Sequence, residues 1–141
     1  RVMAVGLRGA YLCCNEFARY AGRHRNGRIV NVSSCRAHRP NELESIAYST
    51  SKLALHCLTR SYAAALARYG ITVNTLAPGM IATENMFKRI GRRGYETECG
   101  NIALHRAGTC DEIADGLIWA VENGFMTGET ININGGQTYA P

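Results

Sequence analysis

The sequence predicts an α/β fold in which a parallel β-sheet carries helices on both of its faces. Two observations support this prediction. Segments with the three- and four-residue periodicity of amphipathic helices alternate along the chain with short segments rich in β-branched residues. The short segments are predominantly apolar, which is typical of parallel strands buried under helices. With 141 residues, 46% of them hydrophobic, we expect residues 1–141 to form a single domain with a real core.

The first expected helix runs from the start of the chain to about residue 21. Its apolar residues recur at helical steps and are Met3, Leu7, Ala10, Cys14, Phe17 and Ala21. Gly27 breaks this pattern, and the segment RIVNVSS (28–34) then reads as a short buried strand. A loop that contains Pro40 follows.

Helical periodicity returns between about Ala47 and Tyr69. The residues on its apolar side are Leu55, Leu58, Tyr62, Ala65 and Leu66. Gly70 is well placed to end this helix, and ITVNTLAP (71–78) predicts a second strand. Residues 80–108 look irregular or weakly helical.

The last part of the chain predicts one helix and one strand. The segment TCDE (109–112) has the pattern of a capping box, and it should open a helix that continues to about Glu122. The segment TININGG (130–136) reads as a last strand that runs into glycines.

Neither cysteine nor histidine spacing favours a metal site. The cysteines are Cys13, Cys14, Cys35, Cys57, Cys99 and Cys110, with no C-x-x-C pair, and the four histidines are scattered. Free cysteines suit a reducing compartment, and no secretory leader opens the chain. No run approaches the roughly 18 apolar residues of a membrane span. We therefore expect a cytoplasmic protein without metal and without a membrane partner.

The net charge of +5 comes from basic residues that gather in two clusters. They are Arg19, Arg23, Arg25 and Arg28 in the first, and Lys88, Arg89, Arg92 and Arg93 in the second. Neither is interleaved with aromatic residues or carried on a known nucleic-acid module, so we expect no nucleic-acid partner. Solvated helix faces are the simpler interpretation, and an acidic protein or an anionic ligand is the better functional alternative.

Candidate functional residues gather where strands should end. In open parallel sheets, chemistry is found at the carboxyl ends of the strands. Ser34 closes the first expected strand, and Pro78-Gly79 follows the second. Tyr48 and Lys52 lie four residues apart on one helix face between them, in a chain with two lysines and fourteen arginines. Because Y-x-x-x-K also occurs on ordinary solvated helices, the pair alone leaves that alternative open.

These motifs together resemble the short-chain dehydrogenase/reductase family. The segments NVSS, YSTSK, VNTLAPGMIAT, EIADGLIWA and TGETININGG follow one another in the order and approximate spacing of that family. The 3-oxoacyl-(acyl-carrier-protein) reductase type is the most similar. The resemblance implies a Rossmann-like doubly wound sheet and hydride transfer between NAD or NADP and a carbonyl or alcohol, without indicating which of the two dinucleotides is used.

The resemblance assigns a role to each candidate residue. Tyr48 matches the acid/base; an unperturbed phenol titrates near ~10, and the ammonium of Lys52 favours its charged form. Lys52 would also hold the nicotinamide ribose, and Ser34 would hydrogen-bond the substrate oxygen. The loop from Pro78 to Thr83 would cover the nicotinamide, and its residues Gly79, Ile81 and Thr83 belong to the expected cofactor site.

Two features depart from the family pattern. Its V-N-L-x-G motif, whose asparagine positions a proton-relay water, appears here as VGLRG with Gly6 in the asparagine position. The N-terminal half of the family domain, with its glycine-rich dinucleotide loop, has no counterpart in these residues; GRRG (91–94) follows no strand. We therefore expect only the C-terminal portion of the fold, with about three of seven strands.

Three functions remain open at this point: the catalytic half of an oxidoreductase, an inactive remnant that pairs with a full-length relative, and a basic binding module. The resemblance further implies a small carbonyl or alcohol substrate held by residues Asn85 to Arg106, and a homodimer or homotetramer built on the first two helices. It also implies docking of an acyl carrier protein at Arg25 and Arg68 beside Tyr69.

Overall fold

A three-stranded parallel sheet forms the centre of the computed structural model, which describes residues 1–23, 25–39 and 45–139. Its strands, in spatial order, are β1 (Arg28–Val32), β2 (Thr72–Pro78) and β3 (Thr130–Ile133). Val32 pairs with Leu76, and Pro78 pairs with Ile133, so the carboxyl ends of the strands meet at one edge. Each strand is shorter than its predicted segment: β1 and β3 lose their last residues to loops, whereas β2 loses only its first residue, Ile71. The prediction of an α/β fold is confirmed.

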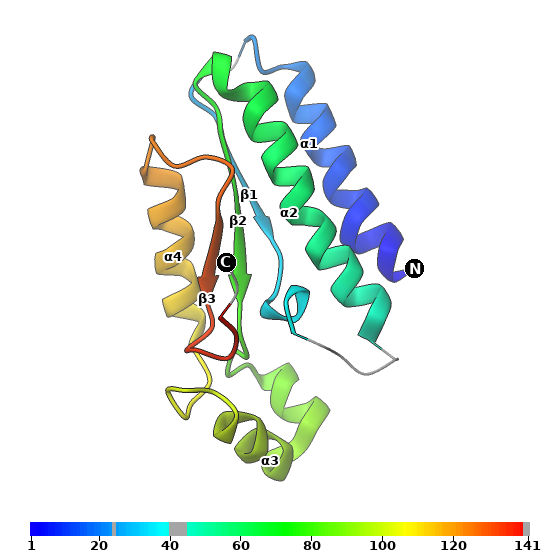
Figure 1. Cartoon of the computed structure of the whole chain (residues 1–141), viewed down its shortest axis with the longest axis vertical. Helices are drawn as coiled ribbons and strands as arrows, with labels where there is room; N and C mark the ends of the chain where they lie inside the picture. Colours follow the sequence, from blue (N-terminus) through cyan, green and yellow to red (C-terminus); the bar gives the residue numbers. More distant parts are fainter. Residues whose placement is uncertain (24, 40–44, 140–141) are drawn as a thin grey trace.

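Helices cover both faces of this sheet, as the apolar strands predicted. Helices α1 (Ala10–Arg19) and α2 (Ile46–Leu66) lie on one face, and α4 (Cys110–Glu122) lies on the other (Figure 1). Helix α2 packs mainly against β2, and α4 contacts all three strands. A Cβ on Gly116 would collide with Ile133, so a glycine here lets α4 approach β3 closely. Pro40 lies outside the described residues.

The first helix differs in form from the expected single helix. Residues Ala4–Gly9 form a π-helical segment, which continues into α1 as far as Arg19. Ala21 therefore lies in the following turn, but it is still fully buried, in one cluster with Leu66 and Val73. The periodicity indicated burial correctly even where the helix had already ended.

A chain of polar contacts links α1, α2 and the sheet. The amide of Asn31 donates to Thr59 Oγ1 over 2.8 Å, and the hydroxyls of Thr59 and Thr75 are 2.7 Å apart. The thiol of Cys14 reaches Asn31 Oδ1 at 3.7 Å. Buried polar groups need such partners, so this chain sets the position of α2 on the sheet.

Helix α2 ends as predicted. A 3₁₀ turn, Ala67–Tyr69, follows it, and Gly70 then adopts a left-handed conformation with φ of 71°. Within the described residues, no helix is both long and apolar enough to cross a membrane.

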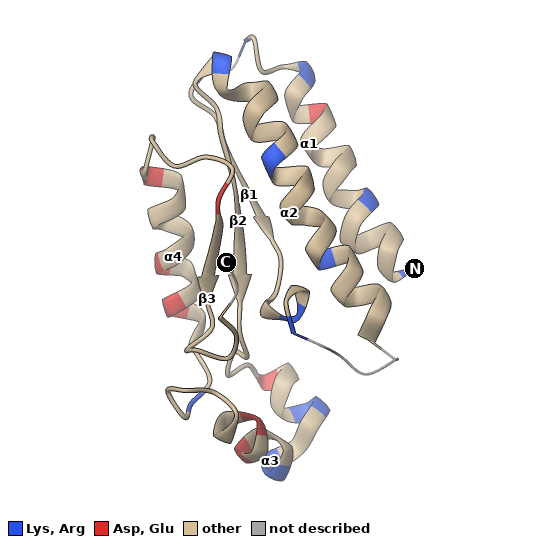
Figure 2. Ribbon diagram, viewed as in Figure 1, with Lys and Arg blue, Asp and Glu red and all other residues tan. Residues whose placement is uncertain are grey.

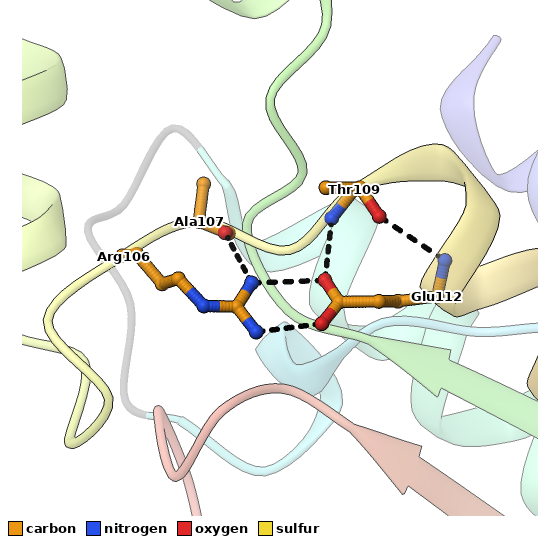
Figure 3. A network of polar contacts seen from close by, with 4 residues as sticks. All are labelled: Arg106, Ala107, Thr109 and Glu112. Carbon is orange, nitrogen blue, oxygen red and sulfur yellow. Dashed lines mark hydrogen bonds and ion pairs between the residues drawn. The ribbon is translucent and has the colours of Figure 1, made fainter.

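The start of α4 forms a capping box, and Arg106 binds the glutamate of this box (Figure 3). The hydroxyl of Thr109 accepts from the N–H of Glu112, whose carboxylate accepts from the N–H of Thr109. Arg106 donates two hydrogen bonds to the same carboxylate, of 2.6 and 2.9 Å, and one to the carbonyl of Ala107. The Arg106 guanidinium and the Thr109 N–H lower the pKa of Glu112 to about 2. The predicted capping box is confirmed.

Helix α3 (Glu84–Gly100) corrects the expectation that residues 80–108 are irregular or weakly helical. Its start is capped by Thr83, whose hydroxyl accepts from the N–H of Met86. A kink at Gly91, with φ of 65°, interrupts the helix and obscures its periodicity.

Two kinds of contact stabilise α3. Ion pairs one turn apart join Lys88 to Glu84 at 2.8 Å and Arg92 to Glu96 at 3.1 Å. Its apolar residues also pack on a small core; they are Met86, Ile90, Tyr95 and Cys99, set against Met80, Ile102 and Ala107. Packing of this kind is tertiary and leaves little signal in a local window.

Candidate functional site

A cavity of about 640 Å³ lies at the carboxyl ends of β1 and β2. Its lining residues are Ser34, Cys35, Arg36, Ser45, Tyr48, Gly79, Met80, Met86, Arg89, Ile90, Glu98 and Gln137. Three of the predicted site residues, Ser34, Tyr48 and Gly79, therefore face one space. They come from the end of β1, the start of α2 and the loop after β2, segments that only the assembled sheet brings together.

The neighbouring serines after β1 have different surroundings. Ser34 lines the cavity, and its Oγ accepts a hydrogen bond from the N–H of Arg36 over 3.2 Å. Ser33 is buried, and its hydroxyl lies 2.8 Å both from the carbonyl oxygen of Lys52 and from Nε2 of His56. The alternation of side chains along an extended chain thus leaves Ser34 as the serine that faces the cavity.

Lys52 lies next to Tyr48 without lining the cavity itself. Its Nζ is 5.7 Å from the centroid of the Tyr48 ring, which confirms that the two residues share one helix face. The same ammonium donates a 2.7 Å hydrogen bond to the carbonyl oxygen of Val32. Burial lowers the pKa of Lys52, since a charged group loses hydration there.

Two histidines, His38 and His56, lie close to the backbone of Lys52. His56 is 4% exposed, and its ring contacts that of His38 at a centroid distance of 4.9 Å. Burial, together with the charges of His38 and Arg60, lowers the pKa of His56 to about 4. With Ser33 bridging the imidazole to the Lys52 carbonyl, this pair supports the backbone from which Lys52 projects. Nothing in the sequence pattern pointed to it.

The loop after β2 uses most of its backbone N–H groups internally. Those of Gly79, Met80, Ala82 and Thr83 donate to Ile133, Gln137, Gly108 and Ile81 respectively, over 2.8–2.9 Å. Within the described residues, the N–H of Ile81 is the one in this loop without an acceptor. It is therefore available to an external acceptor.

The remaining predicted residues of this loop lie elsewhere. Thr83 is occupied in capping α3, and Pro78 is the last residue of β2. Ile81 lines a separate small cavity of about 120 Å³ together with Gly108. The structure thus brings Ser34, Tyr48 and Gly79 together in the larger cavity and places Lys52 beside Tyr48. Pro78, Ile81 and Thr83 lie outside this cavity.

Gly6 lies in the π-helical segment, close to α2. A Cβ at Gly6 would come within 2.8 Å of Ser51 Oγ and 3.2 Å of Ser51 Cβ. Ser51 in turn donates to the carbonyl of Tyr48 over 2.7 Å. The backbone at this position therefore has little room for a side chain, and Gly6 offers no polar group toward the site.

Several cavity residues had no role assigned from the sequence, among them Cys35, Arg36 and Gln137. Met86 and Arg89, by contrast, fall within Asn85 to Arg106, the segment that the resemblance placed at the substrate. The one available hint for Gln137 is its place directly after the last strand, at the same edge as Ser34 and Gly79.

Charged residues outside the cavity are unevenly distributed, and Arg28 has a structural role. Figure 2 shows acidic residues but no basic ones along α4, and both kinds along α3. Arg28 donates to four main-chain carbonyls, among them that of Val121 at 3.0 Å. Among the residues that the structure describes, no three His, Cys, Asp or Glu side chains gather closely enough to hold a metal ion.

Comparisons with known proteins agree with this geometry. The family profile described as "Enoyl-(Acyl carrier protein) reductase" matches residues 1–138. The short-chain reductase protein NovJ of Streptomyces niveus is 37% identical over 144 residues, which cover 96% of this chain and 54% of NovJ.

Two solved structures are similar in sequence and fold. ElxO with NADP bound has a TM-score of 0.86 and 30% identity, over 94% of this chain and 54% of ElxO. A 3-oxoacyl-[acyl-carrier protein] reductase with bound NAD from Brucella melitensis has a TM-score of 0.83 and 30% identity, over 96% of this chain and 50% of that one. The chain thus spans about half the length of the relatives it matches. It belongs to the short-chain dehydrogenase/reductase family.

Proposed function

We propose that this chain forms the catalytic half of an NAD(P)-dependent oxidoreductase that interconverts a carbonyl and an alcohol. The observation that carries the proposal is the shared cavity of Ser34 and Tyr48, with the ammonium of Lys52 next to the Tyr48 ring. The Ser34 hydroxyl and the Tyr48 phenol can both reach a carbonyl oxygen in this cavity, and the Lys52 ammonium lies beside the phenol ring. Such an arrangement suits proton transfer to that oxygen.

The proposed roles follow from the atoms that each residue offers. In the reducing direction, the Ser34 hydroxyl donates a hydrogen bond to the substrate oxygen, and the Tyr48 phenol gives that oxygen its proton. Lys52 stabilises the phenolate that remains, because its ammonium is held beside the ring. A bound dinucleotide supplies the hydride that the carbonyl carbon receives.

The proposed cofactor rests on two grounds: the residues of this chain that suit a nicotinamide, and the dinucleotides bound in the two similar structures. The free N–H of Ile81 suits a carboxamide oxygen, and Lys52 lies near enough to the site to contact a ribose hydroxyl. Of the two similar structures, one has NADP bound and the other has NAD bound, so the proposal covers both dinucleotides. The residues of this chain suit the nicotinamide end, whereas the pyrophosphate calls for a glycine-rich helix start that these 141 residues do not contain.

The proposal also covers the substrate and the partners. A 3-oxoacyl thioester is the favoured substrate, delivered by an acyl carrier protein that docks near Arg25 and Arg68. A homodimer or homotetramer would cover the apolar surface of the first two helices, where a hollow of about 510 Å³ is lined by Met3, Ala4, Leu7, Arg8, Tyr11 and Leu58.

A second candidate function is an inactive remnant that pairs with a full-length relative. Gly6 favours it, since a glycine supplies none of the polar contacts of the asparagine that the family has there.

The test joins residues 1–141 behind the N-terminal half of the Brucella melitensis reductase; we call the product the joined protein. It should oxidise NADH or NADPH in the presence of acetoacetyl thioesters. Tyr48→Phe should lower this rate by 10²–10⁴-fold, the usual effect of a general acid, at nearly unchanged cofactor affinity. Tyr20→Phe, a change at an exposed tyrosine far from the cavity, serves as the matched control.

Two results would contradict the proposal. An inactive joined protein with intact cofactor binding would favour the remnant. A Tyr48→Phe variant that kept more than about a tenth of the rate would remove Tyr48 from the role of acid/base.

A further inference from the structure

Gln137 reaches the cavity from the far end of the chain. After β3, Gly135 and Gly136 adopt left-handed conformations with φ of 61° and 78°, which turn the backbone back toward the sheet edge. Asn134 closes this turn, since its side chain accepts from the N–H of Gly136 and its carbonyl from that of Gln137, both at 2.9 Å. The Gln137 side chain is thereby directed into the cavity that Ser34 and Tyr48 line.

The side-chain oxygen of Gln137 holds two loops of the site together. Oε1 accepts the N–H of Met80 over 2.9 Å and the thiol of Cys35 over 3.5 Å. Burial raises the pKa of Cys35, so the thiol keeps the proton that it donates. Packing here is tight, because a Cβ on Gly79 would lie 2.9 Å from this oxygen.

These contacts also decide the orientation of the amide. Both partners are donors, so the oxygen of Gln137 must be the atom that faces them, and the NH₂ group must face the other way. Within the residues that the structure describes, no acceptor contacts Nε2. The Nε2 group of this half-buried residue can therefore donate to a molecule bound in the cavity.

A second donor lines the same cavity. The guanidinium of Arg89 contacts only the sulfur of Met86, at 3.4 Å, within the described part of the chain. Among the described residues of the lining, Glu98 is the one acidic residue, and it faces Arg39 at 3.8 Å. The wall around Gln137 thus holds a second donor group, the Arg89 guanidinium, besides the Gln137 amide.

We propose that Gln137 is a substrate-binding residue that recognises a second oxygen atom of the substrate. Ser34 and Tyr48 hold the oxygen that reacts, and the NH₂ of Gln137 donates to an acceptor beside it, such as the carbonyl of a thioester or ester. The site therefore selects β-dicarbonyl compounds over simple ketones. This inference rests on the proposed function and adds the residue that determines substrate class.

The variant Gln137→Glu separates this role from a structural one. A carboxylate still accepts from Met80 and Cys35, but it has no N–H to donate and repels an oxygen acceptor. In the joined protein, Gln137→Glu should lower kcat/KM for ethyl acetoacetate about tenfold or more, mainly through KM, and change that for 2-hexanone less than about threefold.

The control is Asn123→Asp, the same amide-to-acid change at a half-buried residue outside the cavity, whose Oδ1 also accepts a backbone N–H, that of Phe125 at 3.1 Å. It should leave both substrates unaffected. Equal losses for ethyl acetoacetate and 2-hexanone in Gln137→Glu would reduce Gln137 to a loop-positioning residue, and no loss for either would remove it from the site.

A binding measurement tests the inference without turnover. In ¹⁵N-glutamine-labelled joined protein, the side-chain amide signals absent from the Gln137→Glu spectrum belong to Gln137. They should shift on titration with ethyl acetoacetate and stay in place with 2-hexanone. Unmoved signals with both ligands would overturn the inference even in an active enzyme, and a selective shift in an inactive one would uphold it while the proposed function fails.

Discussion

Lys52 donates a hydrogen bond from its ammonium group to the carbonyl oxygen of Val32, the last residue of β1, over 2.7 Å. The bond links the first turns of α2 to the outer strand of the sheet, two residues before Ser34. It holds the charge of Lys52 at the site while burial lowers the pKa of this lysine. The hydrogen bond thus fixes the position of an ammonium group that burial also removes in part from water.

Replacement of Lys52 should therefore affect both chemistry and cofactor binding. In the joined protein, Lys52→Met should lower kcat at least about 100-fold, because the phenolate of Tyr48 loses its neighbouring cation, and raise the KM for the dinucleotide. Steady-state kinetics with NADH and NADPH measure both. Lys88→Met, at the other lysine of the chain, exposed and paired with Glu84, should match the unmodified protein; equal effects of the two changes would contradict the assignment.

The 141-residue chain alone should not bind a dinucleotide tightly. Much of the affinity for such ligands comes from pyrophosphate held by backbone N–H groups at a glycine-rich helix start, which these residues do not contain. Calorimetric titration of the purified chain with NADH and NADPH is the measurement. A dissociation constant in the low micromolar range for either would show that the nicotinamide end suffices.

Gly6 and Ser51 should be energetically coupled. A methyl group at position 6 would press on Ser51 Oγ at 2.8 Å, so Gly6→Ala should cost more in the presence of Ser51 than in a Ser51→Ala background. We expect a coupling free energy of about 1 kcal/mol from urea unfolding of the four proteins. Gly100→Ala, at a helical glycine with no atom within 4 Å of the added methyl, should instead stabilise by up to about 1 kcal/mol. Additive effects of the Gly6 and Ser51 changes would mean that the helix moves away at no cost.

His56 should make stability depend on pH. Its pKa is about 4 in the folded protein and near 6.5 when unfolded, so between these values the unfolded chain binds more protons. The free energy of unfolding should therefore fall as the pH drops from 6.5, by as much as about 3 kcal/mol at pH 4.

The measurement is urea unfolding of the joined protein across this pH range. His56→Leu should remove most of the slope, whereas His105→Asn, at an exposed histidine with φ of 53°, should keep it. An unchanged slope in His56→Leu would assign the pH dependence to other groups.

Arg25 and Arg68 should affect the KM of a substrate carried by a protein, but not the KM of a small soluble substrate. The Arg68 guanidinium lies 4.8 Å from the Tyr69 ring, and the carbonyl of Tyr69 accepts the N–H of Asn26, so the two arginines belong to neighbouring segments. Arg25→Glu and Arg68→Glu should each raise the KM for substrate on an acyl carrier protein several-fold, and less so at high salt. Ethyl acetoacetate should show no change; a similar rise for both substrates would make these arginines simple solvated charges.

Apart from α3, the order of helices and strands could be predicted from the sequence, as could the end of α2, the start of α4 and the Tyr48–Lys52 pair. Each depends on residues within a few positions of one another. Helical periodicity repeats every three or four residues, Gly70 needs only its own left-handed conformation, and the capping box of Thr109 and Glu112 spans four residues.

Other features depend on contacts between distant segments, and only the tertiary structure decided them. Helix α3 is stabilised in part by packing against Met80 and Ile102, and the different surroundings of Ser33 and Ser34 depend on how β1 lies against α2. Gln137 meets Cys35 across 102 positions of the chain, because parallel pairing brings the carboxyl ends of the strands to one edge. The sequence by itself determined which local elements form, whereas their assembly determined which side chains share the cavity.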